Sequence, residues 1–409
     1  MSHCDSPQIP LLPYDEALQQ LVGHISPLNK VTSKPLMQAL GEVLAESRKA
    51  TISVPPADNS AMDGYALNML DIDKAVIPVS QRIAAGEAGV RLEPGTAARI
   101  FTGAPIPQGA DAVIMQEQVI ADDEGIRLQA KPEKGQNIRP AGNDIEIGDT
   151  ILTRGTRLRA QDIGLAASVG LQNLPVFDKV RVGMFFTGDE LVEPGTALKE
   201  GQIYDSNRYT LYGLLKSLGC DIVDLGLVGD TLEATKQAML DASSKADLVV
   251  TCGGVSVGEE DHVRIAIEQL GDLHLWRLRI KPGKPLAFGK INNTAFIGLP
   301  GNPVSVFATF CLFVCPLIKT LQGRNWQKPS GVPVPAGFDW QKPDSRREFL
   351  RARLESDQNG DTVAMIYPNQ DSGVLTSTVW ARGFVEIAEG RTFNKGDWIN
   401  YLAFSEFLE

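Results

Sequence analysis

The sequence predicts an α/β multidomain protein whose central α/β domain is built on a parallel sheet. The chain has 409 residues, which is more than one compact hydrophobic core usually contains. From Lys179 to about residue 321, apolar strand-like runs alternate with helical patterns, which is typical of parallel strands joined by right-handed crossovers. Short β-runs broken by Gly and Pro occur before and after this region, and they predict smaller β-rich domains on both sides.

The N-terminal part of the chain is expected to be helical and discontinuous in sequence. Amphipathic helical patterns cover residues 14–25 and 33–46. A helical pattern returns only at 159–168. We therefore expect residues 1–53 and 139–178 to join as one domain.

Residues 54–138, which separate these two segments, are expected to form an inserted β-rich domain. After Val54 the residue pattern changes to short β-runs separated by Gly and Pro, which is typical of a small β domain. The predicted strands lie at 75–79, 97–101, 112–116 and 125–128.

Residues 179–321 are expected to form the α/β domain. Strands are predicted at 180–186, 221–225, 247–251, 275–280, 285–288 and 295–297. Helices are predicted at 207–218, 232–244, 261–270 and 303–321. Because helices of this length separate the first strands, these strands are expected to be parallel.

A linker and a small all-β domain are expected to complete the chain. Residues 322–336 are rich in Pro and Gly, which favours a linker. Residues 337–409 then form the C-terminal domain. Its predicted strands lie at 348–354, 362–367, 384–387 and 398–403.

Composition and charge exclude several classes of function. The net charge of −11 disfavours nucleic acid, whose phosphates an acidic surface repels. No apolar run reaches the roughly 18 residues of a membrane span, and the polar N-terminus lacks the apolar core of a signal peptide, so a cytoplasmic protein is expected. The five cysteines are scattered without a CxxC, which argues against a zinc site or a disulfide framework. Cys311 and Cys315 are expected to pack inside an apolar helix.

The segment 251–262, TCGGVSVGEEDH, is expected to be an anion-binding loop between a buried strand and a helix. Ligands of open parallel sheets bind at the carboxyl ends of strands. Glycines let backbone N–H groups approach an anion, and a helix N-terminus favours negative charge. Neither GxGxxG nor GxxxxGK[ST] is present, so neither a Rossmann nor a P-loop site is predicted. A tight turn without a ligand is the alternative.

Acidic residues at three strand ends predict a magnesium site. Glu190 follows the first strand in TGDEL, Asp230 follows the second in LVGD, and Asp261 ends the glycine loop. Carboxylates beside a phosphate loop repel the phosphate unless a divalent cation lies between them, and Mg²⁺ binds in this way. Each acid alone is as well explained as a helix cap or a solvated charge.

Two further strand ends carry groups suited to oxyanions. KPGKP (281–285) places Lys281 and Lys284 around a Pro-Gly turn and follows Arg277, although a solvated basic turn is the alternative. LPGNPVS (299–305) places Ser305 at the start of a helix. No Ser-His-Asp arrangement is visible. The parts fit phosphoanhydride chemistry, in which positioning and charge neutralisation dominate.

Taken in order, TGDEL, IYDSN (203–207), GGVSVGEED, KPGKP and LPGNPVS resemble the molybdopterin molybdenumtransferase family, to which the gephyrin E domain is related. These enzymes insert molybdenum in molybdenum cofactor synthesis. DNSAMDGYA (58–66) and FTGA (101–104) resemble two lid loops of the family. The resemblance spans nearly the whole chain.

The resemblance implies a helical hinge region, an inserted β lid, an α/β molybdopterin-binding domain and a C-terminal β-barrel. It implies an elongated homodimer in which the lid of one subunit faces the α/β site of the other. The implied substrates are adenylylated molybdopterin and molybdate. The phosphoanhydride is cleaved with Mg²⁺, AMP is released, and a transient contact with the molybdopterin adenylyltransferase is expected.

The resemblance also implies roles for single residues. Catalytic roles are implied for Asp58, Thr102, Asp144, Glu190, Asp230, Asp261, Lys281 and Lys284. Substrate binding is implied for Gly253, Gly254, Ser256, Gly258, Arg277, Pro300, Asn302, Pro303, Ser305, Arg351 and Ser372. The metal ligands are expected to be Glu190, Asp230 and Asp261. The first three catalytic residues are expected to come from the lid of the partner subunit.

Two other functions remain open on the residues alone. The first is adenylyl transfer to molybdopterin, because that enzyme shares the α/β domain type. The second is a non-catalytic pterin-binding or scaffold protein. Molybdate and tungstate have the same charge and nearly the same size, and nothing in the sequence separates them.

Overall fold

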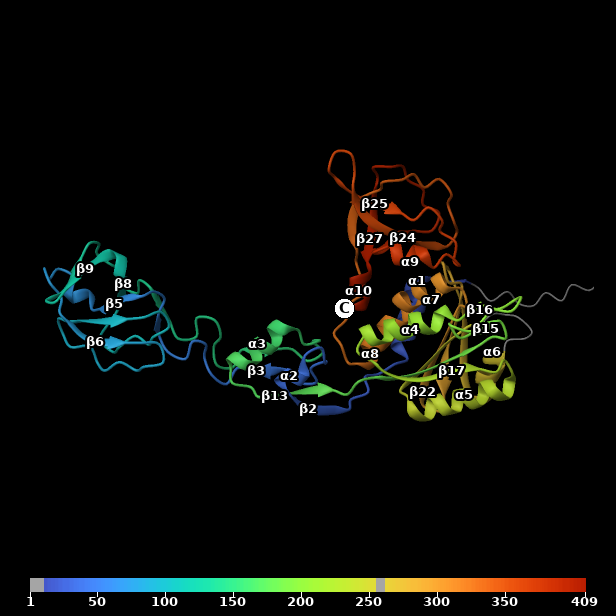
Figure 1. The fold of residues 1–409 in the computed structure, drawn as a ribbon, viewed down its shortest axis with the longest axis horizontal. Helices are drawn as coiled ribbons and strands as arrows, with labels where there is room; N and C mark the ends of the chain where they lie inside the picture. The colour runs from blue at the N-terminus through green and yellow to red at the C-terminus, as the bar shows by residue number, and fades with distance from the viewer. Residues whose placement is uncertain (1–10, 255–261) are drawn as a thin grey trace, which may run out of the picture.

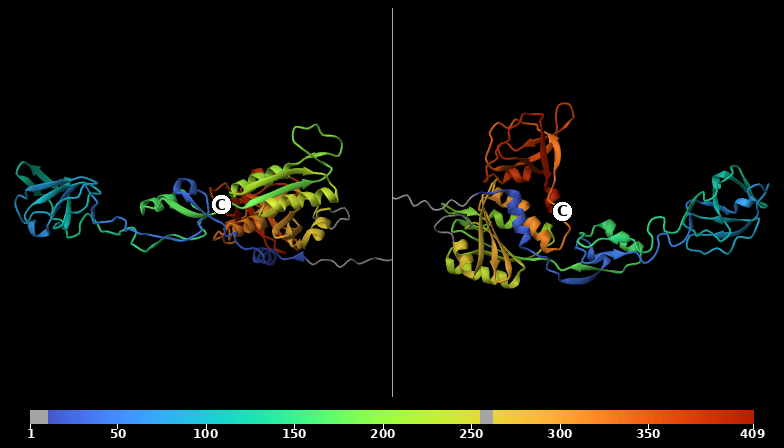
Figure 2. Two further views of the ribbon diagram at one scale, coloured as in Figure 1. Left: turned by 90° about the horizontal axis from the view of Figure 1, so that it is seen from below. Right: turned by 180° about the vertical axis from the view of Figure 1, so that it is seen from behind.

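The computed structural model describes residues 11–254 and 262–409. The molecule is elongated: a small β-rich part lies at one end, and an α/β part with a C-terminal β-rich part lies at the other (Figures 1 and 2). A slender segment connects the two ends. We call these parts distal (59–139), connecting (31–49 and 150–177), central (11–23 and 181–321) and C-terminal (332–408).

The central part is built on a seven-stranded sheet with the order β1-β19-β21-β22-β18-β14-β17. The bounds are β1 (Leu11–Leu12), β14 (Arg181–Thr187), β17 (Asp221–Val228), β18 (Leu248–Cys252), β19 (Gly271–Leu278), β21 (Pro285–Ile291) and β22 (Thr294–Leu299). Strand β14 is parallel to β17 and β18, and β18 is parallel to β22.

The expected all-parallel sheet is wrong in one strand. β21 pairs antiparallel with both β19 and β22. Only Asn292 and Asn293 separate β21 from β22, and Asn292 has a φ of 54°. Two residues make a hairpin, whereas a parallel connection needs a crossover of a dozen residues or more.

Helices cover both faces of this sheet (Figure 1). The bounds are α1 (Tyr14–Gly23), α4 (Ser206–Ser217), α5 (Leu232–Lys245), α6 (His262–Leu270), α7 (Pro303–Thr309), the π-helical η3 (Phe310–Val314) and α8 (Cys315–Leu321). Alternate residues of β14 point to opposite faces. Met184 and Phe186 pack in the core that contains α1, α4 and the 303–321 helix, and Phe185 packs in the core under α5 and α6. A short ladder joins β15 (Leu191–Val192) and β16 (Ile203–Tyr204).

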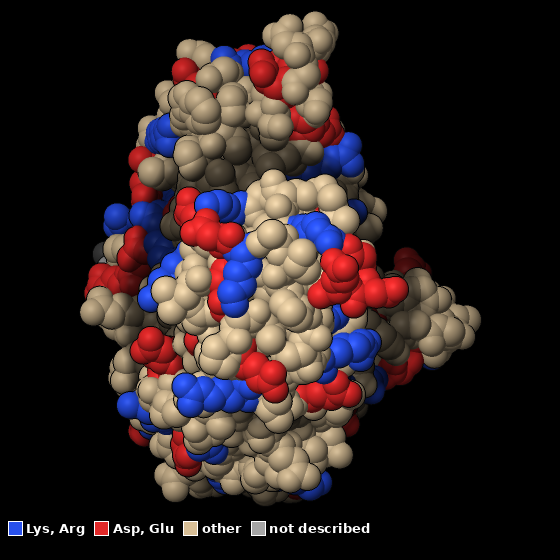
Figure 3. All heavy atoms as spheres, turned by 90° about the vertical axis from the view of Figure 1, so that its left-hand side faces the viewer, with Lys and Arg blue, Asp and Glu red and all other residues tan. Residues whose placement is uncertain are grey.

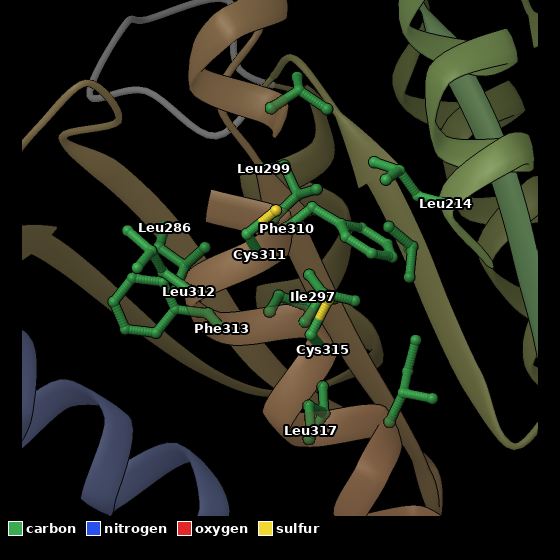
Figure 4. Packing of buried hydrophobic residues seen from close by; sticks show 14 of the residues in the cluster. Leu214, Leu286, Ile297, Leu299, Phe310, Cys311, Leu312, Phe313, Cys315 and Leu317 are labelled. Carbon is green, nitrogen blue, oxygen red and sulfur yellow. The ribbon is translucent and has the colours of Figure 1, made fainter. Parts of the chain in front are cut away.

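The continuous helix Pro303–Leu321 is the main buried helix of the central part. By length and composition it would suit a membrane span, alone among the helices of residues 11–254 and 262–409, but 89% of its most apolar stretch is buried. It is therefore a core helix, as its apolar pattern predicts. Cys311 and Cys315 face the core beside Ile297, Phe313 and Leu299 (Figure 4), and burial raises the pKa of the Cys311 thiol well above its usual value. The expected packing role of these cysteines is confirmed.

The connecting part is less helical than expected. Residues 33–46 do not form a helix: β2 (Val31–Pro35) pairs with β13 (Asn173–Phe177), and α2 (Leu36–Ala39) makes a single turn. Gly41 has a φ of 80°, a left-handed conformation in which a helix ends. The remaining elements are β3 (Arg48–Lys49), β12 (Thr150–Leu152) and the expected helix α3 (Ala160–Ser168).

The distal part is β-rich, as expected. Its four-stranded sheet has the order β6-β7-β5-β8 and is flanked by a β9-β10 hairpin. The bounds are β4 (Asn59–Ser60), β5 (Gly64–Leu67), η1 (Met69–Asp71), β6 (Val79–Ile83), β7 (Ala97–Ile100), β8 (Ala112–Met115), η2 (Gln116–Gln118), β9 (Val119–Asp122), β10 (Gly125–Leu128) and β11 (Ile138–Arg139). The strand expected at 75–79 begins only at Val79.

The C-terminal part is a six-stranded sheet, and no closed barrel is found among the residues that the structure describes, so the expected β-barrel is not confirmed. The strand order is β20-β24-β26-β27-β23, with β25 also paired to β24. The bounds are β20 (Ile280–Lys281), β23 (Val332–Pro335), β24 (Arg347–Ser356), β25 (Thr362–Ile366), α9 (Thr376–Trp380), β26 (Gly383–Ile387), β27 (Trp398–Ala403) and α10 (Phe404–Leu408). Only an isolated bridge between Ala336 and Ala364 joins the β23 and β25 edges. β23 also occupies the end of the segment expected to be a linker.

Candidate functional site

Five strands of the central sheet end at the same edge. β14, β17, β18 and β22 are parallel, so their carboxyl ends share this edge. β19 also ends here, because β21 is antiparallel to both β19 and β22. The loops that follow these five strands carry the motifs TGDEL, LVGD, GGVSVGEED, KPGKP and LPGNPVS. The strand directions confirm that the described residues of these motifs follow strand ends at one sheet edge, whereas residues 255–261 of GGVSVGEED lie outside the described residues.

A cavity of about 830 Å³ lies at this edge, between the central and C-terminal parts. Its wall combines loops of the central part with the segment 370–373 of the C-terminal part. The residues predicted from the sequence that line it are Glu190, Gly253, Lys281, Lys284, Pro300, Asn302, Pro303, Ser305 and Ser372. The structure therefore brings together residues that are up to 182 positions apart, from 190 to 372.

Other predicted residues do not line this cavity. They are Asp230, Gly254, Arg277 and Arg351, together with Asp58, Thr102 and Asp144 of the distal and adjoining segments. Ser256, Gly258 and Asp261 lie outside the described residues. Their predicted roles stay predictions.

The turn between Lys281 and Lys284 is built around a glycine. Gly283 has a φ of 99°, and a Cβ at this position would lie 2.5 Å from the Thr309 side chain. Only glycine fits such a backbone without strain. The turn therefore places two cationic side chains on the cavity wall.

The two lysines have different surroundings. Lys281 Nζ lies 2.8 Å from Glu348 Oε1 and 3.6 Å from Asp344 Oδ2. Asp344 also accepts hydrogen bonds from Arg346, a cavity residue that the sequence did not single out. These bonds from Arg346 lower the pKa of Asp344 to about 2. Within the described part of the chain, no carboxylate is ion-paired with Lys284.

Arg351 is buried behind the cavity and does not line it. Its side chain is 1% exposed, and its guanidinium donates to the Ser377 hydroxyl and to the Asp371 carbonyl, both at 3.0 Å. Burial lowers its pKa to about 10. The Gln370 side chain also accepts a bond from the Arg351 backbone N–H at 3.0 Å. In this chain Arg351 supports the segment that carries Ser372.

Ser372 links the C-terminal part to the LPGNPVS loop. The Asn302 amide donates to the Ser372 hydroxyl at 3.0 Å, and the Val304 N–H donates to the Ser372 carbonyl at 3.0 Å. Ser305, three per cent exposed, lies one residue further along the same helix and lines the cavity. Two hydroxyl groups from different parts of the chain therefore lie on one wall.

The acids are arranged less compactly than the sequence predicts. Glu190 lines the cavity, whereas Asp230 lies behind Thr187, whose hydroxyl donates to Asp230 Oδ1 at 2.7 Å. No group of three His, Cys, Asp or Glu residues suited to a metal occurs within residues 11–254 and 262–409. Asp261, the third predicted ligand, is outside this part.

Asp205 and Asn207 are polar residues of the site that sequence reasoning quoted in IYDSN without a role. Asp205 is 2% exposed, and its Oδ1 accepts from the Arg208 N–H at 3.1 Å as the N-cap of α4. Among the described residues its Oδ2 has no hydrogen-bond partner, and burial raises its pKa. The Asn207 amide donates to the Gly301 carbonyl at 2.8 Å, and its Oδ1 has no partner in the same part of the chain. An Asp-Ser-Asn run before a helix is an N-cap signature, and this signal could have found them.

Figure 1 shows the distal part, which carries Thr102, at the opposite end of the molecule from the central part. Asp58 and Asp144 lie in the segments that adjoin the distal part, and none of the three predicted lid residues lines the cavity. Thr102 donates through its hydroxyl and its N–H to Asp63 Oδ1, both at 2.7 Å, and these bonds lower the pKa of Asp63. Asp58 accepts from the Ala141 N–H at 2.8 Å. Figure 3 views the molecule from the distal end, and acidic and basic side chains are interspersed on this face.

Comparisons with known proteins agree with this arrangement. Residues 12–170 match the family described as MoeA N-terminal region (domain I and II), residues 183–320 the probable molybdopterin binding domain, and residues 333–404 the MoeA C-terminal region (domain IV). A molybdopterin molybdenumtransferase from Haemophilus influenzae is 38% identical over 97% of this chain and 100% of the relative. The chain belongs to the molybdopterin molybdenumtransferase family.

Similarity to the family extends over the whole molecule. A molybdopterin molybdenumtransferase from Bacillus subtilis is 32% identical over 97% of this chain and 94% of the relative. The crystal structure of the molybdopterin biosynthesis moeA protein from Pyrococcus horikoshii is 31% identical, with a TM-score of 0.84 over 96% of this chain and 100% of that chain. Membership in the molybdopterin molybdenumtransferase family places this chain among the transferases of molybdenum cofactor biosynthesis.

Proposed function

We propose that this chain inserts molybdenum into molybdopterin, with adenylylated molybdopterin and molybdate as substrates and AMP as a product. The phosphoanhydride of the adenylylated substrate is cleaved, and molybdenum remains on the dithiolene of the pterin. The observation that supports this most strongly is the cavity wall, where Lys281, Lys284 and Ser305 lie beside Gly253. Cleavage of a phosphoanhydride depends mainly on positioning and charge neutralisation, which such a wall supplies.

The oxyanion is assigned to the wall between the central and C-terminal parts. Lys281 and Lys284 neutralise its charge, and the hydroxyl groups of Ser305 and Ser372 donate hydrogen bonds to its oxygens. Arg351 acts indirectly: its guanidinium donates to the carbonyl of Asp371, the residue before Ser372, and so holds Ser372 in place. The phosphate of the pterin is assigned to the glycine loop from Gly253 to Gly258, which includes Gly254 and Ser256.

The acids around the cavity fit a magnesium ion. Mg²⁺ binds through one or two carboxylates together with substrate phosphates and water. Glu190 is on the wall, and Asp205 adds a buried carboxylate oxygen that lacks a hydrogen-bond partner within residues 11–254 and 262–409. Glu190, Asp230 and Asp261 would hold the ion, which when bound neutralises charge on the phosphates.

The site is proposed to be completed by a second copy of the chain. Thr102 belongs to the distal part, which lies at the opposite end of the elongated molecule from the central part (Figure 1), and Asp58 and Asp144 lie in the segments next to it. In a homodimer the distal part of one subunit, acting as a lid, faces the cavity of the other. The Asp63 carboxylate then keeps Thr102 in place, because it accepts both bonds that Thr102 donates.

A transient contact with the molybdopterin adenylyltransferase is proposed as the route of delivery. The adenylylated pterin is the product of one enzyme and the substrate of the other. Direct transfer between the two proteins keeps a reactive phosphoanhydride out of water.

The test is a measurement of AMP release by the purified chain. Adenylylated molybdopterin, Mg²⁺ and molybdate are supplied, and tungstate replaces molybdate in a parallel series. AMP release that depends on the oxyanion supports the proposal. Consumption of ATP with bare molybdopterin would instead assign adenylyl transfer, and binding of the pterin without turnover would assign a scaffold.

A further inference from the structure

Glu348 is a buried carboxylate of the C-terminal part that contacts a cavity lysine of the central part. Strand β20 pairs in parallel with β24, and the register places Lys281 opposite Glu348. Lys281 Nζ lies 2.8 Å from Glu348 Oε1. The backbone pairing and the ion pair therefore join the two parts at the same position of the cavity wall.

The environment of Glu348 makes this contact different from a surface ion pair. The side chain of Glu348 is 2% exposed, whereas that of Lys281 is 42% exposed and lines the cavity. The other carboxylate oxygen of Glu348 accepts a hydrogen bond from Trp340 Nε1 at 3.1 Å. A buried carboxylate is costly unless a cation and hydrogen bonds satisfy it, so the pair has few alternative arrangements.

The two lysines of the KPGKP turn are therefore held differently. Asp344 lies 3.6 Å from the same Lys281 ammonium and is itself fixed by Arg346. Lys284, across the turn, has no ion-pair partner in the described residues. One lysine is tethered and the other is not.

We infer that Glu348 is a positioning residue, which tethers the Lys281 ammonium at the cavity wall so that it meets the oxyanion substrate in one geometry. The inference rests on the proposed function, because it assigns the ammonium to molybdate. Glu348 does not line the cavity and acts only through Lys281. A carboxylate so close to the Lys281 ammonium could instead compete with the oxyanion for it. Whether removal of the Glu348 charge weakens or strengthens molybdate binding therefore distinguishes positioning from competition.

Glu348→Gln is the decisive variant, because glutamine keeps the acceptor for Trp340 and removes the charge that tethers Lys281. The KM for molybdate in AMP release is expected to rise about tenfold, with a much smaller change in the KM for adenylylated molybdopterin. In a Lys281→Ala background the same substitution is expected to add little, because the group through which it acts is gone. Glu348→Asp, which keeps the charge, is expected to recover part of the loss.

Glu355→Gln is the matched control, because Glu355 lies on the same strand and pairs with Arg353. It is expected to behave as the unmodified chain. Calorimetric titration with molybdate alone gives a readout that does not need turnover, and melting temperatures identify a variant that fails to fold. The inference is overturned if the Glu348→Gln variant binds molybdate as tightly as the unmodified chain, or more tightly. It is also overturned if Glu348→Gln weakens molybdate binding as much in the Lys281→Ala background as in the unmodified chain. If the unmodified chain releases no AMP, the proposed function fails, and the calorimetric series still decides the role of Glu348.

Discussion

The Asn302 side-chain amide donates a hydrogen bond of 3.0 Å to the Ser372 hydroxyl, across the boundary between the central and C-terminal parts. The Val304 N–H donates to the Ser372 carbonyl over the same distance. The cavity wall therefore depends on both parts of the chain being held together at this point. Ser372 therefore both joins the two parts and lines the cavity.

Ser372→Ala removes the hydroxyl and leaves the backbone contact with Val304 in place. We expect a loss of stability of no more than about 1 kcal/mol, because one partly exposed hydrogen bond is lost. The KM for molybdate is expected to rise several-fold, because a donor to the oxyanion is removed. Steady-state AMP release and urea denaturation measure the two effects. Thr378→Ala, on α9 of the same part and bonded only to a local carbonyl, is the control, and equal kinetics in the two variants would contradict the assignment of Ser372.

Arg351→Ala is expected to destabilise the protein more than it affects binding directly. The substitution leaves the Asp371 carbonyl and the Ser377 hydroxyl without their donor and opens a buried cavity, at a cost of about 2–4 kcal/mol. Denaturant unfolding followed by tryptophan fluorescence measures this loss. Arg353→Ala, two residues along β24, changes a half-exposed side chain and is expected to cost less than about 1 kcal/mol. Equal losses in the two variants would show that the Arg351 hydrogen bonds contribute little.

Lys319→Met is expected to stabilise the protein. The Lys319 side chain is buried, and burial lowers its pKa from 10.5 to about 8. A base whose pKa is lower in the folded state binds fewer protons than in the unfolded state between about pH 8 and 10.5, so stability rises with pH across this window. Methionine removes the penalty, and we expect a gain of about 1–3 kcal/mol at pH 7.

The pH dependence provides the control for this prediction. Free energies of unfolding are measured from pH 7 to 10 for both forms. The gain from methionine is expected to be largest at pH 7 and to shrink toward pH 10. A gain that does not change with pH, or a loss, would contradict the role assigned to the buried ammonium.

A mixture of two inactive variants tests the proposed lid in trans. Asp58→Asn alters the proposed lid, at the residue that enters the distal part, and Lys284→Ala alters the cavity wall. Each variant alone is expected to be nearly inactive. After equal mixing and subunit exchange, half of the dimers carry one of each, and each such dimer has one site with both elements intact. Activity is therefore expected to recover to about a quarter of the unmodified level. No recovery, despite exchange shown by labelled subunits, would place the lid residues in the same subunit as the site.

Much of the fold was predictable from the sequence, because long elements have strong patterns. The strands that begin at Asp221 and Thr362 and the helices that begin at Leu232 and Ser206 lie within a residue or two of their predicted starts. The short N-terminal elements were not predictable, because β2 forms by pairing with the distant strand β13. The reversed direction of β21 follows from the two asparagines between β21 and β22, which are the kind of residues that favour a two-residue hairpin.

Part of the candidate site was likewise predictable from the sequence, and part was not. The loops at one sheet edge follow from strand polarity, which brings Glu190, Lys281 and Ser305 to one cavity. The sequence could not predict that Lys281 is paired with Glu348, because this contact forms across two parts of the chain. Nor could it predict that Arg351 is buried beneath the 370–373 segment and does not line the cavity itself, because this depends on its hydrogen bonds to Asp371 and Ser377.

The release of AMP from adenylylated molybdopterin tests the central claim most directly. The purified chain is mixed with a limiting amount of this substrate and Mg²⁺, and molybdate is added to one half of the sample. We expect AMP to appear in proportion to the substrate when molybdate is present, and the Lys284→Ala variant to release almost none under the same conditions. An intact adenylylated substrate after addition of molybdate, in a sample whose fold is confirmed by circular dichroism, would contradict the account.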